Sequence, residues 1–227
     1  MKQTHGQAAG ILDMIRRAGI AAIVIAALPQ AAAAHPHVFV ESNLEILRDA
    51  QGNVTELRHV WRFDDLFSSD VLLNYDANGD GKLDAAELDE VGRTVGSSIA
   101  EYDYYTEVRS GSETDEFNPP EAVMVDYVDN QVLMFFSLKM KEPVSLKGKP
   151  FKVSVSDPTF YVAMEIASDA AVQVTGEGAA CKVQIDRPDF DKLNSQSSLT
   201  LTEQFFADPK NASLGDDWLT WVSVECP

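Results

Sequence analysis

Two neighbouring segments early in the chain alternate apolar and polar residues, and their charges indicate how they pair. Residues 37–46 show this alternation, and residues 56–63 repeat it after Gln51-Gly52. A strand places successive side chains on opposite faces, so each segment has one face suited to a core. Folding about a two-residue turn at Gln51-Gly52 would set acidic residues opposite basic ones. These pairs are Glu41 with Arg62 and Glu45 with Arg58. The sequence therefore predicts an antiparallel hairpin of this register.

The rest of the pattern is a series of short strands with one helical interruption. Residues 66–75 and 84–100 read as helices, and Asp64-Asp65 are suited to a helix start. Further strands are predicted at 121–128, 131–140, 151–156, 159–166, 171–175, 181–185 and 219–226. Asp129-Asn130 is a tight-turn signal, and residues 187–210 read as a loop with a short helix. We predict a mainly β fold, a β-sandwich of immunoglobulin-like general shape with a helical insertion at about residues 64–101.

The first 34 residues have the order of a secretory signal peptide. Arg16-Arg17 precede an apolar run at 18–28 and the small residues 32–34. The run is about half of the ~20 residues that a membrane-spanning helix needs, so we expect no permanent anchor. We expect cleavage after Ala34 and export to the periplasm. Residues 35–227 would then form a single β-rich domain that begins at His35.

The charge balance excludes one class of partner. Residues 1–34 hold three of the 18 basic and one of the 36 acidic residues, which leaves 15 and 35 and a net charge of −20. A nucleic-acid-binding domain needs a basic surface, so we expect no nucleic-acid partner. A strongly acidic domain attracts cations, although the acidity is equally explained by solubility alone.

Two cysteines, Cys181 and Cys226, occur in the chain. In an oxidising compartment an even count favours a disulfide, which would close a loop of about 45 residues. The alternative is two buried free thiols. Their spacing does not match a redox or zinc motif.

A twelve-residue segment, Asp76–Glu87, matches an EF-hand calcium loop. Side-chain oxygens recur at positions 1, 3, 5, 9 and 12, a glycine occupies position 6, and position 7 offers its carbonyl. The candidate ligands are Asp76, Asn78, Asp80, Lys82, Asp84 and Glu87. We predict that this loop binds Ca²⁺, as opposed to being an acidic solvated turn. Because EF-hands that act as sensors come in pairs and this loop stands alone, a structural role is favoured over a switch.

The predicted mature terminus is a second candidate metal site. His35 would offer its α-amine and imidazole, and His37 could add a third nitrogen. Nitrogen ligands suit Ni²⁺, Co²⁺, Zn²⁺ or Cu²⁺. In the predicted hairpin, Asp64 and Asp65 approach the same end of the sheet and could complete the site. The alternative is a frayed terminus with two histidines by chance.

Two further residues have plainer interpretations. His59 lies on the apolar face of its strand, so we expect a hydrogen-bonded core histidine. Asp157-Pro158 is expected to form a turn. The sequence contains no Ser-His-Asp set, phosphate loop or HExxH helix, and we predict that the protein is not an enzyme.

Five segments together resemble the DUF1007 family of exported proteins. They are 35–40, 58–65, 76–87, 101–106 and 156–162. The resemblance covers nearly the whole predicted mature chain. It implies a periplasmic protein associated with nickel/cobalt permeases of the inner membrane, and the family's signature histidines correspond to His35 and His37.

Three functions follow as hypotheses. The first is a periplasmic calcium-binding accessory protein of a nickel/cobalt-type transport system, with a metal site at His35. The second is a calcium-stabilised interaction module that docks on a membrane partner and binds no transition metal. The third is a copper oxidase that uses an amine–imidazole brace at His35.

Overall fold

The predicted hairpin forms with the predicted pairs. A computed structural model describes residues 37–178, 180–189 and 216–227, which belong to one compact unit, 35–227. Strands β1 (Val38–Arg48) and β2 (Asn53–Phe63) are antiparallel. The charge pairs stand opposite each other as Glu41 with Arg62 and Glu45 with Arg58. Cross-strand charge complementarity was thus sufficient to predict the register.

The connection between these strands is not the predicted two-residue turn. The register shifts by one residue between Leu47 and Arg48, and the turn closes where the Asp49 N–H donates to the Asn53 carbonyl at 2.9 Å. The Asp49 carboxylate also accepts from the backbone N–H groups of Gln51 and Asn53. These added bonds favour the longer turn. The bulge absorbs the extra residue and leaves the predicted pairs unchanged.

A second hairpin extends the same sheet. Strands β5 (Met124–Val128) and β6 (Gln131–Ser145) are antiparallel. Asp129 and Asn130 both have positive φ, at 53° and 64°. Two left-handed residues are what a type I′ turn requires, so the predicted tight turn is confirmed.

The described residues form two sheets. The larger has the order β5-β6-β2-β1-β8, with β9 also pairing with β1, and the smaller has the order β10-β11-β7-β3-β4. Both β8 (Val162–Glu165) and β9 (Val172–Gly176) run parallel to β1. The smaller sheet consists of β3 (Thr106–Ser110), β4 (Glu113–Asp115), β7 (Phe151–Val155), β10 (Lys182–Asp186) and β11 (Trp221–Glu225). The prediction of a mainly β fold with two sheets is confirmed, and the immunoglobulin-like shape stays a prediction.

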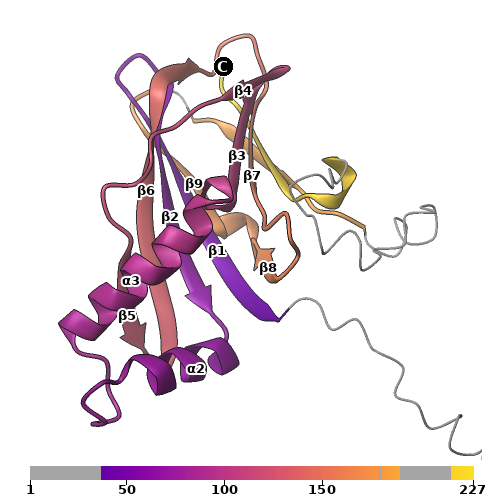
Figure 1. Ribbon diagram of the computed structural model, residues 1–227. Helices are drawn as coiled ribbons and strands as arrows, with labels where there is room; N and C mark the ends of the chain where they lie inside the picture. Colours follow the sequence, from indigo (N-terminus) through magenta and orange to yellow (C-terminus); the bar gives the residue numbers. More distant parts are fainter. Residues whose placement is uncertain (1–36, 179, 190–215) are drawn as a thin grey trace, which may run out of the picture. The chain divides into compact units, whose positions relative to one another are not determined.

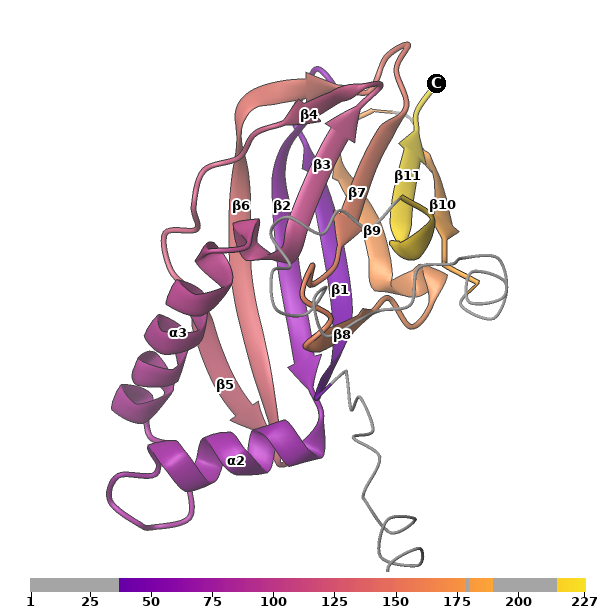
Figure 2. The same cartoon turned by 45° about the vertical axis from the view of Figure 1, so that its right-hand side comes forward.

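A single apolar core contains residues of both sheets. Its largest fully buried side chains are Trp61 of the larger sheet and Phe151 of the smaller one. The predicted apolar face of β1 is buried, since Val38, Val40, Leu44 and Ile46 are each at most 5% exposed. Figures 1 and 2 show β3, β7 and β11 on one side of the long strands of the larger sheet. The opposite face of that sheet carries the alternate side chains.

Two α-helices lie between β2 and β3 in the chain. They are α2 (Asp65–Tyr75) and α3 (Ala85–Ala100), close to the predicted ranges. Figure 2 shows α2 at the end of the sheet where β2 ends. The Ser68 hydroxyl donates to the Asp64 carbonyl and accepts from the buried Val132 N–H, which ties α2 to β6. None of the described helices is long and apolar enough to span a membrane.

Helix α3 packs very closely on the segment that leads into β5. A Cβ atom added at Gly92 would overlap the Val123 carbonyl oxygen, and one at Gly96 would stand 2.9 Å from a methyl group of Val123. The two glycines lie one helical turn apart on the buried side of α3. Their missing side chains let the helix approach the backbone.

The predicted disulfide is confirmed. Cys181 and Cys226 are bonded, next to the paired strands β10 and β11. The loop predicted within residues 187–210 lies mostly outside the described residues, as does the predicted signal peptide.

Candidate functional site

The predicted calcium loop connects α2 to α3 and closes around Asp76. The Asp76 carboxylate accepts hydrogen bonds from the backbone N–H groups of Gly79 at 2.8 Å, Asp80 at 3.1 Å and Gly81 at 2.7 Å. Gly79 and Gly81 have φ values of 72° and 79°, a region that glycine adopts without strain. The first position of the loop therefore organises its tight turn.

The last third of the loop begins helix α3. The Asp84 carboxylate accepts from the N–H groups of Ala86 and Glu87, and the Glu87 carboxylate accepts from the Asp84 N–H. This reciprocal arrangement is a capping box. The other Glu87 oxygen accepts from the Ala77 N–H at 2.8 Å, so this buried side chain links both ends of the loop. The sequence carried the signal for the box, Asp84 followed three residues later by Glu87.

The donor set of the loop fits a hard cation. It offers carboxylate and amide oxygens within twelve residues, which are the ligands that Ca²⁺ prefers. Among the described residues, however, no three His, Cys, Asp or Glu side chains stand together as a group able to hold a metal ion. Each loop carboxylate instead accepts backbone hydrogen bonds, including that of Asp80, which accepts from the Lys82 N–H.

The described residues of the predicted transition-metal site, His37, Asp64 and Asp65, lie near one end of β1. His35 lies outside the described residues. The His37 N–H donates to the Tyr161 carbonyl at 2.9 Å, and its ring centroid is 5.0 Å from that of Tyr161. Asp65 is exposed in the first turn of α2. The described members of this predicted site form no metal-binding group by themselves.

Asp64 has a structural role that the sequence indicated only in part. One oxygen accepts from the N–H groups of Leu66 and Phe67 and caps α2, as the acidic start signal implied. The other accepts from the Phe39 N–H at 2.7 Å and extends the hairpin. Both oxygens are thus engaged in joining β1 to α2.

His59 lies in the core, as expected, but without the expected hydrogen bond. It is 1% exposed, and neither ring nitrogen has a partner among the described residues. Its ring stacks on Phe136, with centroids 4.6 Å apart. Burial lowers the pKa of His59 to about 3, so the ring is neutral at physiological pH. The alternation of β2 was enough to predict that His59 is buried. Whether it has a hydrogen-bond partner depends on residues packed against it from elsewhere in the chain, which the local pattern does not reveal.

The expected turn at Asp157 is confirmed. Its buried carboxylate accepts from the Thr159 N–H, the Thr159 hydroxyl and the Val162 N–H.

The segment 103–105, whose Tyr105 carbonyl accepts from the Ser156 N–H beside this turn, contains three consecutive non-glycine residues with φ near 50°. Such residues cost about 1–2 kcal/mol each. The stacking of Tyr105 on Trp61 offsets part of this cost, and burial, followed by the charge of Asp157, raises the pKa of Tyr105.

The sequence did not predict a groove on the outer face of the larger sheet. It has a volume of about 970 Å³. Its floor is formed by β1, β2 and β6, and its sides by residues 118–124 and 170–173. The alternation of β1, β2 and β6 could have identified the floor residues. The sides could not be found from local patterns, since they come from segments distant in the sequence.

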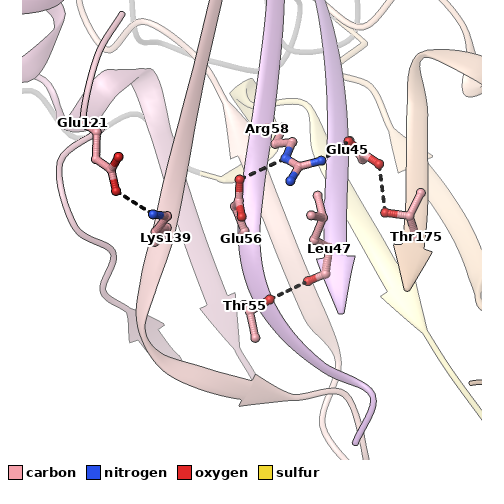
Figure 3. A network of polar contacts seen from close by, with 8 residues as sticks. All are labelled: Glu45, Leu47, Thr55, Glu56, Arg58, Glu121, Lys139 and Thr175. Carbon is pink, nitrogen blue, oxygen red and sulfur yellow. Dashed lines mark hydrogen bonds and ion pairs between the residues drawn. The ribbon is translucent and has the colours of Figure 1, made fainter. Parts of the chain in front are cut away.

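Ion pairs in two separate groups lie in this groove (Figure 3). Arg58 donates to Glu56 at 2.9 Å and to Glu45 at 3.4 Å, and the Thr175 hydroxyl donates to the other oxygen of Glu45. Lys139 pairs with Glu121 at 2.6 Å. Burial would raise the pKa of Glu56, but hydrogen bonds from Arg58 and Ser137, together with the charges of Arg58 and Lys139, lower it overall. Both cations of the groove thus have acidic partners.

Comparison with known proteins shows two related sequences and one family. The chain is 24% identical over 196 residues to an uncharacterized protein of Haemophilus influenzae, covering 85% of this chain and 91% of that protein. It is 26% identical over 110 residues to an uncharacterized 15.5 kDa protein in the trpE 3′ region of Spirochaeta aurantia, covering 48% and 78%. Residues 20–226 match the family described as "Protein of unknown function (DUF1007)". Because this match extends over nearly the whole sequence, the chain belongs to the DUF1007 family.

Proposed function

We propose that this protein is a periplasmic calcium-binding accessory protein of a transition-metal transport system. The observation that carries the calcium part is the closure of loop 76–87 on the Asp76 carboxylate between two helices. In this proposal the helix–loop–helix unit is an EF-hand inserted in an immunoglobulin-like sandwich. The ligands are Asp76, Asn78, Asp80, Lys82, Asp84 and Glu87.

The proposed role of calcium is structural. Helix α2 is tied to β6 through Ser68, and α3 is packed on Val123 through its glycines. A cation held between the helices would therefore stabilise a unit that is fixed to the larger sheet at both ends. Ca²⁺ that binds only the folded chain stabilises it by about 2.7 kcal/mol at a concentration one hundred times its Kd.

The variant Glu87→Gln separates calcium binding from helix capping. Glutamine can serve the same position of a capping box, but it lacks the bidentate carboxylate. Because the glutamine NH₂ group cannot accept a hydrogen bond, one of the two N–H groups bound to Glu87 loses its partner, so we expect a somewhat lower Tm than the wild type in EDTA. The calcium-specific result is the loss of the rise in Tm that Ca²⁺ gives the wild type. Asp89→Asn, an exposed change outside the loop, is the matched control. Equal Tm values for the wild type with Ca²⁺ and with EDTA would contradict the proposal.

The transport part of the proposal is supported by the family resemblance and by the predicted histidine-bearing terminus. The disulfide is typical of proteins in oxidising compartments, which supports the periplasmic location. In the proposed site, the His35 amine and imidazole and the His37 imidazole bind Ni²⁺, Co²⁺, Zn²⁺ or Cu²⁺, with Asp64 and Asp65 nearby. The proposed partner is an inner-membrane metal permease.

Calorimetric titration of protein with a native His35 terminus tests this part. We expect binding of at least one of the four ions, weakened as the pH falls below neutrality because the nitrogens must be unprotonated. One additional residue before His35, or His37→Ala, should weaken it strongly, whereas His59→Ala should not. Equal affinity in all four proteins would refute the transition-metal site.

A second candidate function is a calcium-stabilised interaction module without a transition metal. It is favoured by the engagement of both Asp64 oxygens in backbone hydrogen bonds. If the terminal titrations show no binding while Ca²⁺ raises the Tm, this second function replaces the first.

A further inference from the structure

The outer-face groove has an apolar strip across its floor. Val60, Phe135 and Met124 are register neighbours on β2, β6 and β5. They occupy the face of the sheet opposite the core, and Met124 is 63% exposed. The outer face of a two-sheet fold is usually polar, so apolar side chains in adjacent positions there indicate a contact surface.

The charges around this strip are predominantly acidic. The outer face of the larger sheet holds seven carboxylates and four cationic groups within the described residues of β1, β2, β5, β6, β8 and the segment before β5. The carboxylates are Glu41, Glu45, Glu56, Glu116, Glu121, Asp126 and Glu165, and the cations are Arg58, Arg62, Lys139 and Lys141. Glu41 and Glu165 are direct neighbours on β1 and β8. In the part of the chain that the structure describes, neither forms an ion pair.

We infer that this groove binds a cationic, partly apolar segment of a protein partner. Apolar side chains of the segment would cover Val60, Phe135 and Met124, and its basic side chains would meet the surplus carboxylates. An anionic membrane surface would be repelled by the same charges. A second copy of the chain would bring two acidic faces together, which like-charge repulsion opposes.

The dimensions of the groove agree with a peptide segment. Its volume of about 970 Å³ is at the upper end of the range for small-molecule pockets. Its floor is three strands wide, and residues 118–124 and 170–173 bound it on the two sides. The Asn118 N–H donates to the Lys139 carbonyl at 2.7 Å, so the first side is attached to β6. The groove is therefore already formed before a partner binds.

Selection from a library of random twelve-residue peptides tests the inference. The immobilised target is protein 35–227 in EDTA, so that the outcome does not depend on the calcium site. We expect enrichment of peptides that combine lysine or arginine with large apolar residues. The affinity of a labelled selected peptide is then measured by fluorescence anisotropy.

Two groove variants each have a control of equal charge change elsewhere. Met124→Lys is matched by Leu73→Lys, since Leu73 is an 80% exposed apolar residue on α2. Glu121→Lys is matched by Asp70→Lys, another exposed residue of α2. All four positions are exposed, so the variants should fold, and their Tm values verify it.

We expect each groove variant to weaken peptide binding at least about tenfold and each control less than about twofold. Binding should also weaken between low and high salt. Equal losses in variants and controls would show attraction by net charge alone and would overturn the proposal. Failure to enrich peptides, or enrichment of acidic ones, would overturn it as well. If the wild type forms a dimer and Met124→Lys abolishes that dimer, the groove binds a second copy of the chain and the proposal is overturned.

Discussion

Removal of the buried imidazole of His59 should change how the stability of the protein depends on pH. Burial lowers the pKa of His59 to about 3, whereas a histidine in an unfolded chain titrates near 6.5. Between these two values the unfolded state binds one proton more than the folded state. The folded state is therefore favoured fully above pH 6.5, and this contribution is lost as the pH falls towards 3.

The magnitude follows from the number of protons. A difference of one proton changes the free energy of unfolding by about 1.4 kcal/mol per pH unit. From pH 6.5 to 4.5 the wild type should lose about 2–3 kcal/mol through this residue. The variant His59→Leu cannot bind the proton and should lack this loss. In the wild type the ring nitrogens of His59 have no hydrogen-bond partners among the described residues, so replacing His59 by leucine leaves no described group without its partner.

Urea unfolding of both proteins at pH 7, 6, 5 and 4 measures the effect. The carboxylates titrate alike in the two proteins, so the difference between the two unfolding free energies isolates His59. We expect this difference to shift in favour of His59→Leu as the pH falls, and His59→Gln to show the same shift. A difference that stays constant from pH 7 to pH 4 would refute the assignment of a neutral, buried imidazole.

Three further predictions concern packing and cross-linking. Denatured protein without reductant should have no alkylatable thiol, and reduction should add the mass of two hydrogens; two reactive thiols before reduction would contradict the Cys181–Cys226 bond. Gly92→Ala should lower the unfolding free energy by about 1–3 kcal/mol because its Cβ overlaps backbone. Gly96→Ala should lower it less, since only a Val123 methyl group must move, and the reverse order in urea unfolding would be inconsistent with this packing. Ser68→Ala leaves the buried Val132 N–H unpaired and should cost about 1–3 kcal/mol, with Ser69→Ala as an exposed control that melts like the wild type.

The sequence predicted local pairing well and distant pairing poorly. The register of β1 with β2 and the Asp129-Asn130 turn followed from charges and turn residues a few positions apart. The bulge near Arg48 was missed because two competing turn geometries satisfy the same charge pairs. The short strands β3 and β4 were not separately predicted, since three to five residues carry little periodicity. The parallel pairing of β8 and β9 with β1 was inaccessible, because no local signal links segments so far apart.

For the candidate site, the chain positions of the loop residues were predicted, but their bonds were not. The spacing of Asp76–Glu87 identified the donors, whereas the hydrogen bonds of Glu87 to Asp84 and Ala77 depend on how the loop closes and on how α3 begins. The groove needed three-dimensional information, because residues near 120 and near 170 form its sides.

The parallel pairing of β1 also has a kinetic consequence. Val38 pairs with Val162, and Leu44 pairs with Val172. One edge of β1 therefore stays unpaired until residues more than 120 positions later in the sequence are available. Contacts at such long separation form slowly, because a long loop must close before they provide any stabilisation. During synthesis, which proceeds from the N-terminus, the β1–β2 hairpin can form early with its outer edge unpaired. The first strand of the chain, β1, is therefore among the last to gain its full set of neighbours in the larger sheet. Until β8 and β9 pair with it, the polypeptide remains incompletely folded.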